Sequence, residues 1–471
     1  MIFAIVNISC LDTKIFIETL VEQNKELAKT IEVLLARIVS LEAELSVYKN
    51  KKNSGNSHKP PSTDITAPKR NQSLREQSGK KPGGQPGHKG HTLQIKADPD
   101  KIIDHRPCSC GNCGSDLSGM AEEVVEKRQV VDIPPIQPVY TEHRVYAKTC
   151  ICGHVTEGYF PGSVTAPMQY GSNTEALVAY LHARQYLPFE RMTELFNHVL
   201  NLPISEGSIV NMVHRFANKA QPAYQAIKAG IEQAGCLGAD ETGGKVNGKK
   251  QWFWTWQNDE LTFIIHSPSR GFDTIESAFP DGFADTILVH DRWAAQLKCE
   301  AKGHQICTAH LLRDLNFIEQ LHDSQWAKDF KVLIKDAIAF KNQTAAEADY
   351  NLFSPPRLAL EGRLQQILDQ SIPDTHHKAV SLRKQLVKIQ QQILLFLHHS
   401  FVPADNNGSE RAIRNVKVKQ KISGQFKSET GAKAFATIRS IIDTAIKSGK
   451  DVLTELEAIA NLNPFADLKM T

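Results

Sequence analysis

Residues 236–267 read CLGADETGGKVNGKKQWFWTWQNDELTFIIHS, and this stretch predicts three β-strands lying side by side. Asn247-Gly248 indicates a tight hairpin between the first two strands, because both central residues of a type I′ turn take positive φ angles. After that turn, tryptophan occupies every second position from Trp252 to Trp256, which predicts an aromatic face buried on one side of a sheet. A third apolar run, 261–266, follows a polar turn and completes the three strands.

Three acidic residues stand at positions that suit a functional site. Asp240 lies in the middle of the first strand, a position that disfavours aspartate, although taken alone it would be interpreted as a solvent-facing acid on an edge strand. Asp291 directly follows the buried strand 286–290, and acids just past the carboxyl end of such a strand line the crevice where α/β sheets bind their ligands. Glu410 lies in the first turn of a helix that begins after the polar turn 403–409.

The composition is ordinary for a globular protein, with 41% hydrophobic and 23% charged residues among 471. This length predicts about three domains. The net charge of +3 is nearly balanced, so any basic surface must be local. No apolar run approaches the ~18 residues needed to cross a bilayer, and residues 1–6 are apolar without a preceding basic residue. We therefore expect a cytoplasmic, nucleoid-associated protein without a membrane partner, whose nine cysteines are metal ligands or buried thiols.

The segment 15–49 shows a heptad pattern. The a positions are mostly isoleucine and the d positions mostly leucine, and this combination favours a parallel coiled coil. Asn24 at an a position fixes its register. This pattern predicts a homo-oligomer, whereas the alternative is one amphipathic helix packed on its own core. The following segment, 50–99, is a basic linker with few large apolar residues, which predicts disorder and contact with a phosphate backbone. The alternative for this segment is a solubilising linker.

The segment 100–160 predicts a zinc ribbon. Two cysteine pairs, Cys110/Cys113 and Cys150/Cys152, flank two strand-like runs, and each pair is followed by glycine. Four thiolates around Zn²⁺ form a closed, structural tetrahedral site. Cys108 is an alternative ligand in the first pair, and unmetallated buried thiols are the alternative for the whole group.

Most of the remaining chain has helical patterns. Residues 170–230 predict a helix-turn-helix-like DNA-binding module, although a three-helix bundle without DNA contact has the same pattern. We assign the other segments as follows: 235–321 and 401–450, the two parts of an α/β core; 322–400, a helical insertion between them; and 451–471, a C-terminal tail.

The acidic motifs resemble those of a known family. Its three acidic motifs are similar to Asp240-Glu241-Thr242, His290-Asp291-Arg292-Trp293-Ala294 and Asp405-Asn406-Asn407-x-x-Glu410-Arg411-Ala412-x-Arg414. Its other landmarks are similar to Lys81-Pro-Gly-Gly-Gln-Pro-Gly-His-Lys-Gly-His91, the cysteine pairs, Cys307-Thr-Ala-His310-Leu-Leu-Arg313 and the N-terminal coiled coil. The family is the insertion-sequence-sixty-six family of bacterial transposases, and the likeness covers nearly the whole chain in the expected order.

This resemblance implies a multidomain α/β protein with a ribonuclease-H-like core and the chemistry of a DDE transposase. Asp240, Asp291 and Glu410 would then hold two Mg²⁺ or Mn²⁺ ions, which stabilise the entering and leaving oxygens of a phosphodiester. Glu241 is either a fourth ligand or points to the opposite face of its strand. Cys307 and His310 are further candidates near the site.

Basic residues follow Glu410 along its helix and predict contact with DNA phosphates. They are Arg411, Arg414, Lys417, Lys419 and Lys421. A simple Glu410–Arg414 helix ion pair is the alternative, but one such pair does not account for five basic residues. The expected partners are transposon terminal inverted repeats, target DNA and accessory proteins of the same element. The alternative functions are a non-catalytic DNA-binding repressor or transposase relic, and a metal-dependent nuclease without strand transfer.

Overall fold

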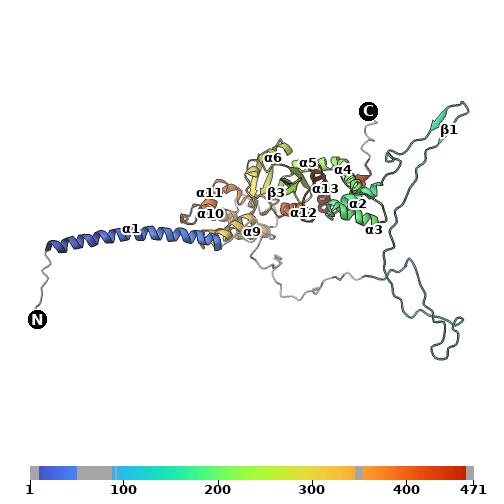
Figure 1. The fold of residues 1–471 in the computed structure, drawn as a ribbon, viewed down its shortest axis with the longest axis horizontal. Coiled ribbons are helices and arrows are strands. Elements are labelled where there is room, and N and C mark those ends of the chain that lie inside the picture. Colours follow the sequence, from blue (N-terminus) through green and yellow to red (C-terminus); the bar gives the residue numbers. More distant parts are fainter. Residues whose placement is uncertain (1–9, 50–86, 88, 91–92, 345–353, 463–471) are drawn as a thin grey trace.

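The computed structural model describes residues 10–49, 87, 89–90, 93–344 and 354–462 (Figure 1). Most of the predicted basic linker, including most of Lys81–His91, and the end of the predicted C-terminal tail lie outside the described residues. Within the described part of the chain, no helix is long and apolar enough to cross a membrane.

The N-terminal segment is one helix, α1 (Cys10–Lys49), of 40 residues. Its heptad residues are exposed: Leu20 by 41%, Leu27 by 61% and Leu34 by 56%. These side chains therefore do not pack on a core of their own chain, which argues against the single-helix alternative. Pairing of this seam with a second copy remains a prediction.

The sheet has five strands in the order β5-β4-β3-β6-β7. They are β3 (Cys236–Val246), β4 (Lys249–Gln257), β5 (Thr262–Ser267), β6 (Phe283–His290) and β7 (Ala301–Ile306). The first three strands are antiparallel, whereas β6 runs parallel to β3 and β7 parallel to β6. The predicted hairpin is confirmed, since Asn247 and Gly248 have φ angles of 45° and 75°.

Both faces of β4 are buried, which corrects the prediction of one buried face. On one side, Trp254 stacks on Trp256, and Trp256 meets Phe279 after α6 (Phe272–Ala278) edge-on at 4.8 Å between ring centroids. On the other side, Phe253 lies 5.1 Å from Phe426, beside α12 (Asn407–Ser423) and α13 (Glu429–Lys447). Because helices cover both faces, the intervening Thr255 is also only 1% exposed.

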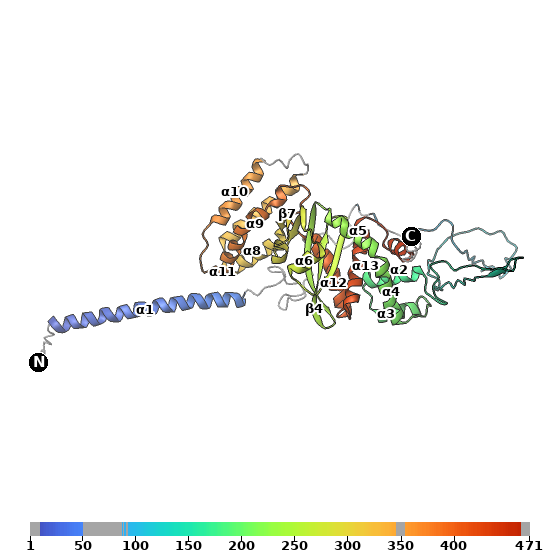
Figure 2. The same cartoon turned by 90° about the horizontal axis from the view of Figure 1, so that it is seen from above.

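Helical groups flank the sheet at its two ends, as the two views show (Figures 1 and 2). On one end lie α2 (Ser172–Ala183), α3 (Phe189–His198), α4 (Glu206–Lys219) and α5 (Gln221–Glu232). On the other end lie α8 (Thr308–His322), α9 (Gln325–Gln343), α10 (Pro355–Asp369) and α11 (His377–Lys388). The short helix α7 (Ala294–Leu297) follows β6, the 3₁₀ turns Gln390–Gln392 and Leu395–Leu397 follow α11, and α14 (Val452–Ala460) follows α13.

Two apolar cores support this arrangement. One joins the helices α2 to α5 to the aromatic faces of β3, β4 and β5. The other joins β6 and β7 to α8, α9, α10 and α11, with Trp326 donating from Nε1 to the carbonyl of Ile367 at 2.9 Å. The two cores place β3 and the carboxyl end of β6 between the helical groups, which is where the acidic residues lie.

Candidate active site

Asp240 is a half-buried carboxylate in the middle of β3. It pairs in register with Thr255 of β4, and its Oδ1 accepts a hydrogen bond from the backbone N–H of Glu241 at 2.8 Å. Burial raises its pKa well above the usual value, and the nearby charges of Asp291, Glu241 and Glu410 raise it further. Among the described residues, no basic side chain forms an ion pair with Asp240. A protein that buries a carboxylate beside three others stores a repulsion that a bound cation would relieve.

Asp291 is positioned by the turn that ends β6. Arg292 takes a left-handed conformation with φ of 72°, and Asp291 Oδ1 accepts from the N–H of Trp293 at 3.0 Å. Before it, His290 is fully buried, and burial and His304 lower its pKa to about 3, so it is neutral at physiological pH. Its Nε2 lies 3.0 Å from Nδ1 of His304 on β7. The turn is therefore held by both parallel strands.

Glu410 is brought to the sheet by the start of α12. Asn406 joins three elements: its N–H donates to Cys307 Sγ at 3.2 Å, and its Nδ2 donates to the carbonyl of Ala239 at 2.8 Å. Its Oδ1 accepts from Ser409 Oγ at 2.7 Å. Ala239 immediately precedes Asp240, so Asn406 fixes the first turn of α12 against the strand that holds Asp240.

The carboxylate of Glu410 contacts α8. Its Oε1 accepts from Arg313 Nη2 at 3.2 Å and lies 3.5 Å from His310 Nε2. The charge of Glu410, like that of Asp291, acts on Asp240. Glu410 itself is in contact with Arg313 and His310. Within the part of the chain that the structure describes, no three His, Cys, Asp or Glu side chains are grouped closely enough to hold a metal ion. The carboxylate chemistry and charge of the three acids nevertheless fit a hard divalent cation.

Glu241 points to the other side of its strand and binds Arg270. Its Oε1 accepts from Arg270 Nε at 2.8 Å and from Nη2 at 2.6 Å, and the Glu241 side chain is only 1% exposed. The Arg270 guanidinium also lies over Trp293 and Trp252, at 3.6 and 4.8 Å from the ring centroids. Burial and the nearby charge of Asp291 raise the pKa of Glu241, although the Arg270 partner opposes this shift. Glu241 therefore lies close to the acidic centre with a basic side chain bound to it.

The basic residues of α12 do not form one continuous strip. Arg411, Arg414 and Lys421 lie on its outer side, whereas Lys417 donates to the carbonyl of Gly243. The prediction that Lys419 contacts DNA is wrong, because this side chain is only 5% exposed. It donates to the carbonyls of Tyr186 and Leu187 at 3.4 and 3.3 Å. Burial lowers its pKa to about 8. The helical period turns this one lysine towards the core while its neighbours face outwards.

Cys307 has a structural position. It is 1% exposed at the start of α8, and burial raises the pKa of its thiol to about 11. Next to it, Thr308 donates from both its N–H and its hydroxyl to the carbonyl of Ala404, at 3.0 and 2.8 Å. These bonds join α8 to the segment leading into α12, and they set His310 and Arg313 beside Glu410.

The first cysteine pair forms a tight turn. Gly114 donates to the carbonyl of Cys110 at 2.9 Å and has a φ angle of 76°. The pKa of Cys113 is lowered to about 7, chiefly by a hydrogen bond from Ser115, and this shift favours the thiolate that binds metal. The turn therefore prepares one half of a thiolate site.

The second cysteine pair forms a similar turn between two short antiparallel strands, β1 (Ala147–Thr149) and β2 (Val155–Glu157). Gly153 donates to the carbonyl of Cys150 at 2.8 Å and has a φ angle of 86°. Hydrogen bonds from the backbone and side chain of Cys152 lower the pKa of the Cys150 thiol. Both Cys150 and Cys152 are exposed, so their thiols are accessible to a metal.

The structure differs from the predicted zinc site in how the two pairs are arranged. A four-thiolate site requires all four sulfurs around one ion, yet among the described residues no three potential ligands are grouped closely enough to hold a metal. The thiols concerned are Cys110, Cys113, Cys150 and Cys152. They are free and mostly exposed rather than buried, which also corrects the alternative of buried thiols. Zinc binding by Cys152 and the other three therefore requires the two turns to come together.

The sequence did not identify three residues that the structure places at the site. Arg313 could have been identified, because it lies three positions after His310 and therefore shares its helix face. Asn406 belongs to the motif of Glu410, but its role as a cross-link depends on long-range packing. Arg270 offered no local signal, since its partners Glu241 and Trp293 are distant in sequence.

The fold and the site together define an α/β protein with a five-strand mixed sheet and an acidic centre on its central strands. A family model described as "Transposase IS66 family" matches residues 167–434. The protein therefore belongs to the IS66 family of transposases. A model described as "zinc-finger binding domain of transposase IS66" matches residues 107–153, and a family of unknown function (DUF6444) matches residues 8–94.

One curated relative is the uncharacterized protein y4qI of Sinorhizobium fredii (strain NBRC 101917 / NGR234). It is 22% identical over 414 residues, covering 81% of this chain and 75% of the relative.

Proposed function

We propose that this protein is a DDE transposase that hydrolyses DNA at transposon ends and joins the freed 3′-hydroxyl to target DNA. Its catalytic residues are Asp240, Asp291 and Glu410. The sheet order, three antiparallel strands followed by two strands parallel to the first, supports a ribonuclease-H-like core. Helices α9 to α11 then form an insertion between the second and third acids.

The observation that supports this proposal most is the electrostatic state of Asp240. The charges of Asp291 at the end of β6 and of Glu410 on α12 both act on Asp240 of β3, although the three are far apart in sequence. Holding these half-buried charges close together without a basic partner for Asp240 costs stability. A purely structural role gives no reason for that cost, whereas binding of a divalent metal does.

Each part of the chain has a role in this reaction. Two Mg²⁺ or Mn²⁺ ions held by the three acids would stabilise the entering and leaving oxygens of the phosphodiester. Arg313 and His310 hold Glu410 in place, and Asn406 fixes α12 to β3. The neutral His290 and the bent backbone at Arg292 orient Asp291.

The parts outside the core would bind DNA and assemble the complex. Arg411, Arg414 and Lys421 lie on the outer side of α12, and they offer charge-assisted contacts to DNA phosphates near the acids. The module α2 to α5 and the basic linker would bind the terminal inverted repeats, and α1 would pair copies of the chain. Accessory proteins of the same element complete the expected partners.

The decisive experiment follows the DNA products. We expect the full-length protein with Mg²⁺ to cut DNA that contains the element's own ends and to yield molecules joined to target DNA. Replacing Mg²⁺ with EDTA should abolish both products, because the chemistry needs the divalent ion. Cleavage without joined product would instead indicate a nuclease. Binding without any cleavage would indicate a repressor or an inactive relic.

A second expectation concerns zinc. Protein purified under reducing conditions should contain about one zinc per chain, and Cys110→Ser, Cys150→Ser or Cys152→Ser should lose it. Cys236→Ala is the matched control, because this thiol lies in β3 and burial raises its pKa to about 12. Elemental analysis measures the metal content. Absence of zinc from the freshly reduced parent protein would reject the site.

A further inference from the structure

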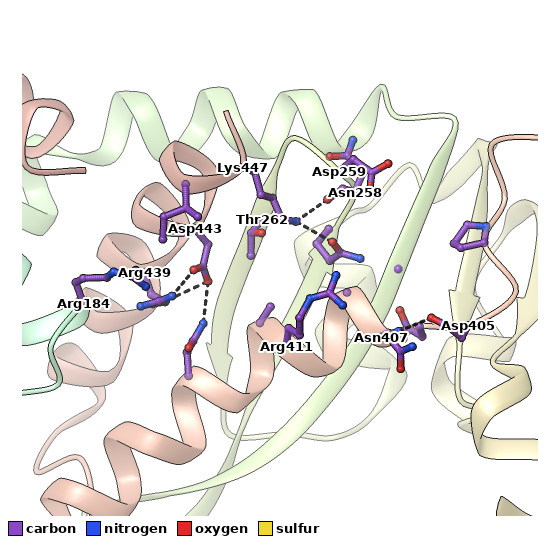
Figure 3. A pocket seen from close by; sticks show the side chains of 18 residues that line it. Arg184, Asn258, Asp259, Thr262, Asp405, Asn407, Arg411, Arg439, Asp443 and Lys447 are labelled. Carbon is purple, nitrogen blue, oxygen red and sulfur yellow. Dashed lines mark hydrogen bonds and ion pairs between the residues drawn. The ribbon is translucent and has the colours of Figure 1, made fainter. Parts of the chain in front are cut away.

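A polar pocket lies on the side of α12 that faces the β4–β5 turn (Figure 3). Its volume is about 590 Å³, and its walls come from the first turns of α12, the end of α13 and the turn at Asn258 and Asp259. Gly238 and Arg411 also line it. These two residues stand two positions before Asp240 and one position after Glu410, so the pocket adjoins the acidic centre through the same strand and the same helix.

Three cationic side chains reach this pocket without a carboxylate partner within 4 Å among the described residues. They are Arg184 at the end of α2, Arg411 of α12 and Lys447 of α13. Lys447 Nζ donates to three neutral oxygens, which are Gln257 Oε1 at 2.7 Å, the carbonyl of Leu261 at 2.8 Å and the carbonyl of Asn258. These bonds use all three of its donors, so Lys447 contributes charge to the pocket but no free donor. Burial lowers the pKa of Lys447 to about 8, and Arg411 contributes to the lowering. The pocket therefore gathers positive charge, of which Lys447 is the desolvated part, whereas Arg411 is exposed.

The acids in the wall are already engaged or partly solvated. Asp443 is paired with Arg439, whose side chain is almost fully buried. Asp405 Oδ1 accepts from the N–H of Asn407 at 3.0 Å, and Asp259 is exposed on the turn. With Arg439 included, the wall holds four cationic side chains against these three carboxylates, which favours an anion, and the amino terminus of α12 adds to it.

A buried hydroxyl in the wall points independently to a ligand. Thr262 lines the pocket and is 0% exposed, and its Oγ1 has no hydrogen-bond partner among the described residues. A buried polar group without a partner costs about 1–3 kcal/mol. Thr262 lies beside Lys447 in Figure 3, and its hydroxyl is the group left to donate to a ligand in the pocket.

We propose that this pocket binds one nucleotide unit of a single DNA strand, with its phosphate held by Arg411 and Arg184. The proposal rests on the proposed transposase function, because it places this nucleotide next to the phosphodiester at the acids. Ligand pockets of roughly 300–1,000 Å³ accept molecules of nucleotide size, whereas a duplex does not fit. Arginine is suited to phosphate because its planar fork can donate two parallel hydrogen bonds.

The test measures binding without catalysis. The full-length protein is titrated into fluorescent dT8 in EDTA, and anisotropy reports the affinity. We expect Arg411→Gln and Arg184→Gln each to weaken binding about tenfold and to reduce the salt dependence by about one phosphate contact. Lys433→Gln is the matched control, because Lys433 is exposed at the other end of α13. It should change the affinity less than about twofold.

Thr262→Val separates ligand binding from folding. Valine removes an unpartnered hydroxyl, so the variant should be at least as stable as the parent while binding dT8 more weakly. Thermal unfolding measures the first property and anisotropy the second. Unchanged dT8 affinity in Arg411→Gln, Arg184→Gln and Thr262→Val would overturn the proposal.

A competition arm distinguishes a DNA strand from a free nucleotide. Thymidine monophosphate should compete weakly with dT8, and a dT8 with neutral methylphosphonate linkages should bind weakly to the parent. Monophosphate binding tighter than that of dT8 would overturn the assignment to DNA. Because the assay contains EDTA, failure of cleavage leaves this result intact, and Asp291→Asn should still bind dT8.

Discussion

The Asp240→Asn variant should lose DNA cleavage by about 10³-fold or more while becoming more resistant to heat than the parent in EDTA. Both effects have one cause. The Asp240 carboxylate is half-buried near Asp291 and Glu410, and its pKa is raised by the partial loss of water and by those charges. Its ionised form is therefore destabilised in the folded protein, and asparagine removes the charge that the metal needs.

The pH dependence follows from the direction of this shift. Below the unfolded pKa of about 3.9 the carboxyl is protonated in both states and imposes no penalty. As pH rises above that value, the folded state loses stability until its own, higher pKa is passed. The difference in thermal midpoint between Asp240→Asn and the parent should thus widen from pH 4 towards neutral pH.

Calorimetry in EDTA and in Mg²⁺ measures the thermal midpoints of the two proteins, and the cleavage assay measures their activity. Mg²⁺ should stabilise the parent, because a ligand that binds only the folded state raises its stability, but it should not stabilise Asp240→Asn. Asp285→Asn is the matched control on β6, since Asp285 is exposed. Normal cleavage by Asp240→Asn would remove Asp240 from the catalytic residues. A variant less stable than the parent in EDTA would show that the ionised carboxylate does not destabilise the folded state.

Local patterns were sufficient for the hairpin and for the positions of the acids. The turn at Asn247-Gly248 needs two positive φ angles, and few other residues adopt them easily. The burial of β4 on both faces was not predictable in this way. Phe253 is covered by Phe426, and α12 and α13 lie more than 150 residues further along the chain than β4. Alternation within β4 gives no information about such distant helices.

The side-chain partners at the site could not be predicted from the local sequence either. Lys419 belongs to a basic run, yet the carbonyls of Tyr186 and Leu187 hold it inside the protein. Arg270 is identified as a residue of the site only by its contacts with Glu241 and Trp293 in the structure. The residue types indicated the chemistry of the centre, whereas packing decided which charges are available. The pocket beside Arg411 has no sequence signature, because segments far apart in the chain form its walls.

DNA cleavage should also depend on the distance between α12 and β3, and not only on the three acids. At Gly238, an added Cβ would lie 2.5 Å from Asn406 Oδ1 and 2.6 Å from Ser409 Oγ. Such contacts are too short, so the first turn of α12 must move away from the strand. Glu410 moves with that turn, and a displacement of about 1 Å can cost about 10²-fold in rate. We therefore expect Gly238→Ala to lose cleavage by about this factor although all three acids remain.

Gly362→Ala is the matched control for this substitution. Gly362 lies in α10 with no atom within 4 Å of an added Cβ, so alanine should stabilise the helix by up to about 1 kcal/mol and leave cleavage unchanged. Gly238→Ala should instead lose about 1–3 kcal/mol through overpacking, measured by denaturant unfolding. If Gly238→Ala cleaves DNA at the parental rate, the contact between Asn406 and β3 does not set the position of Glu410.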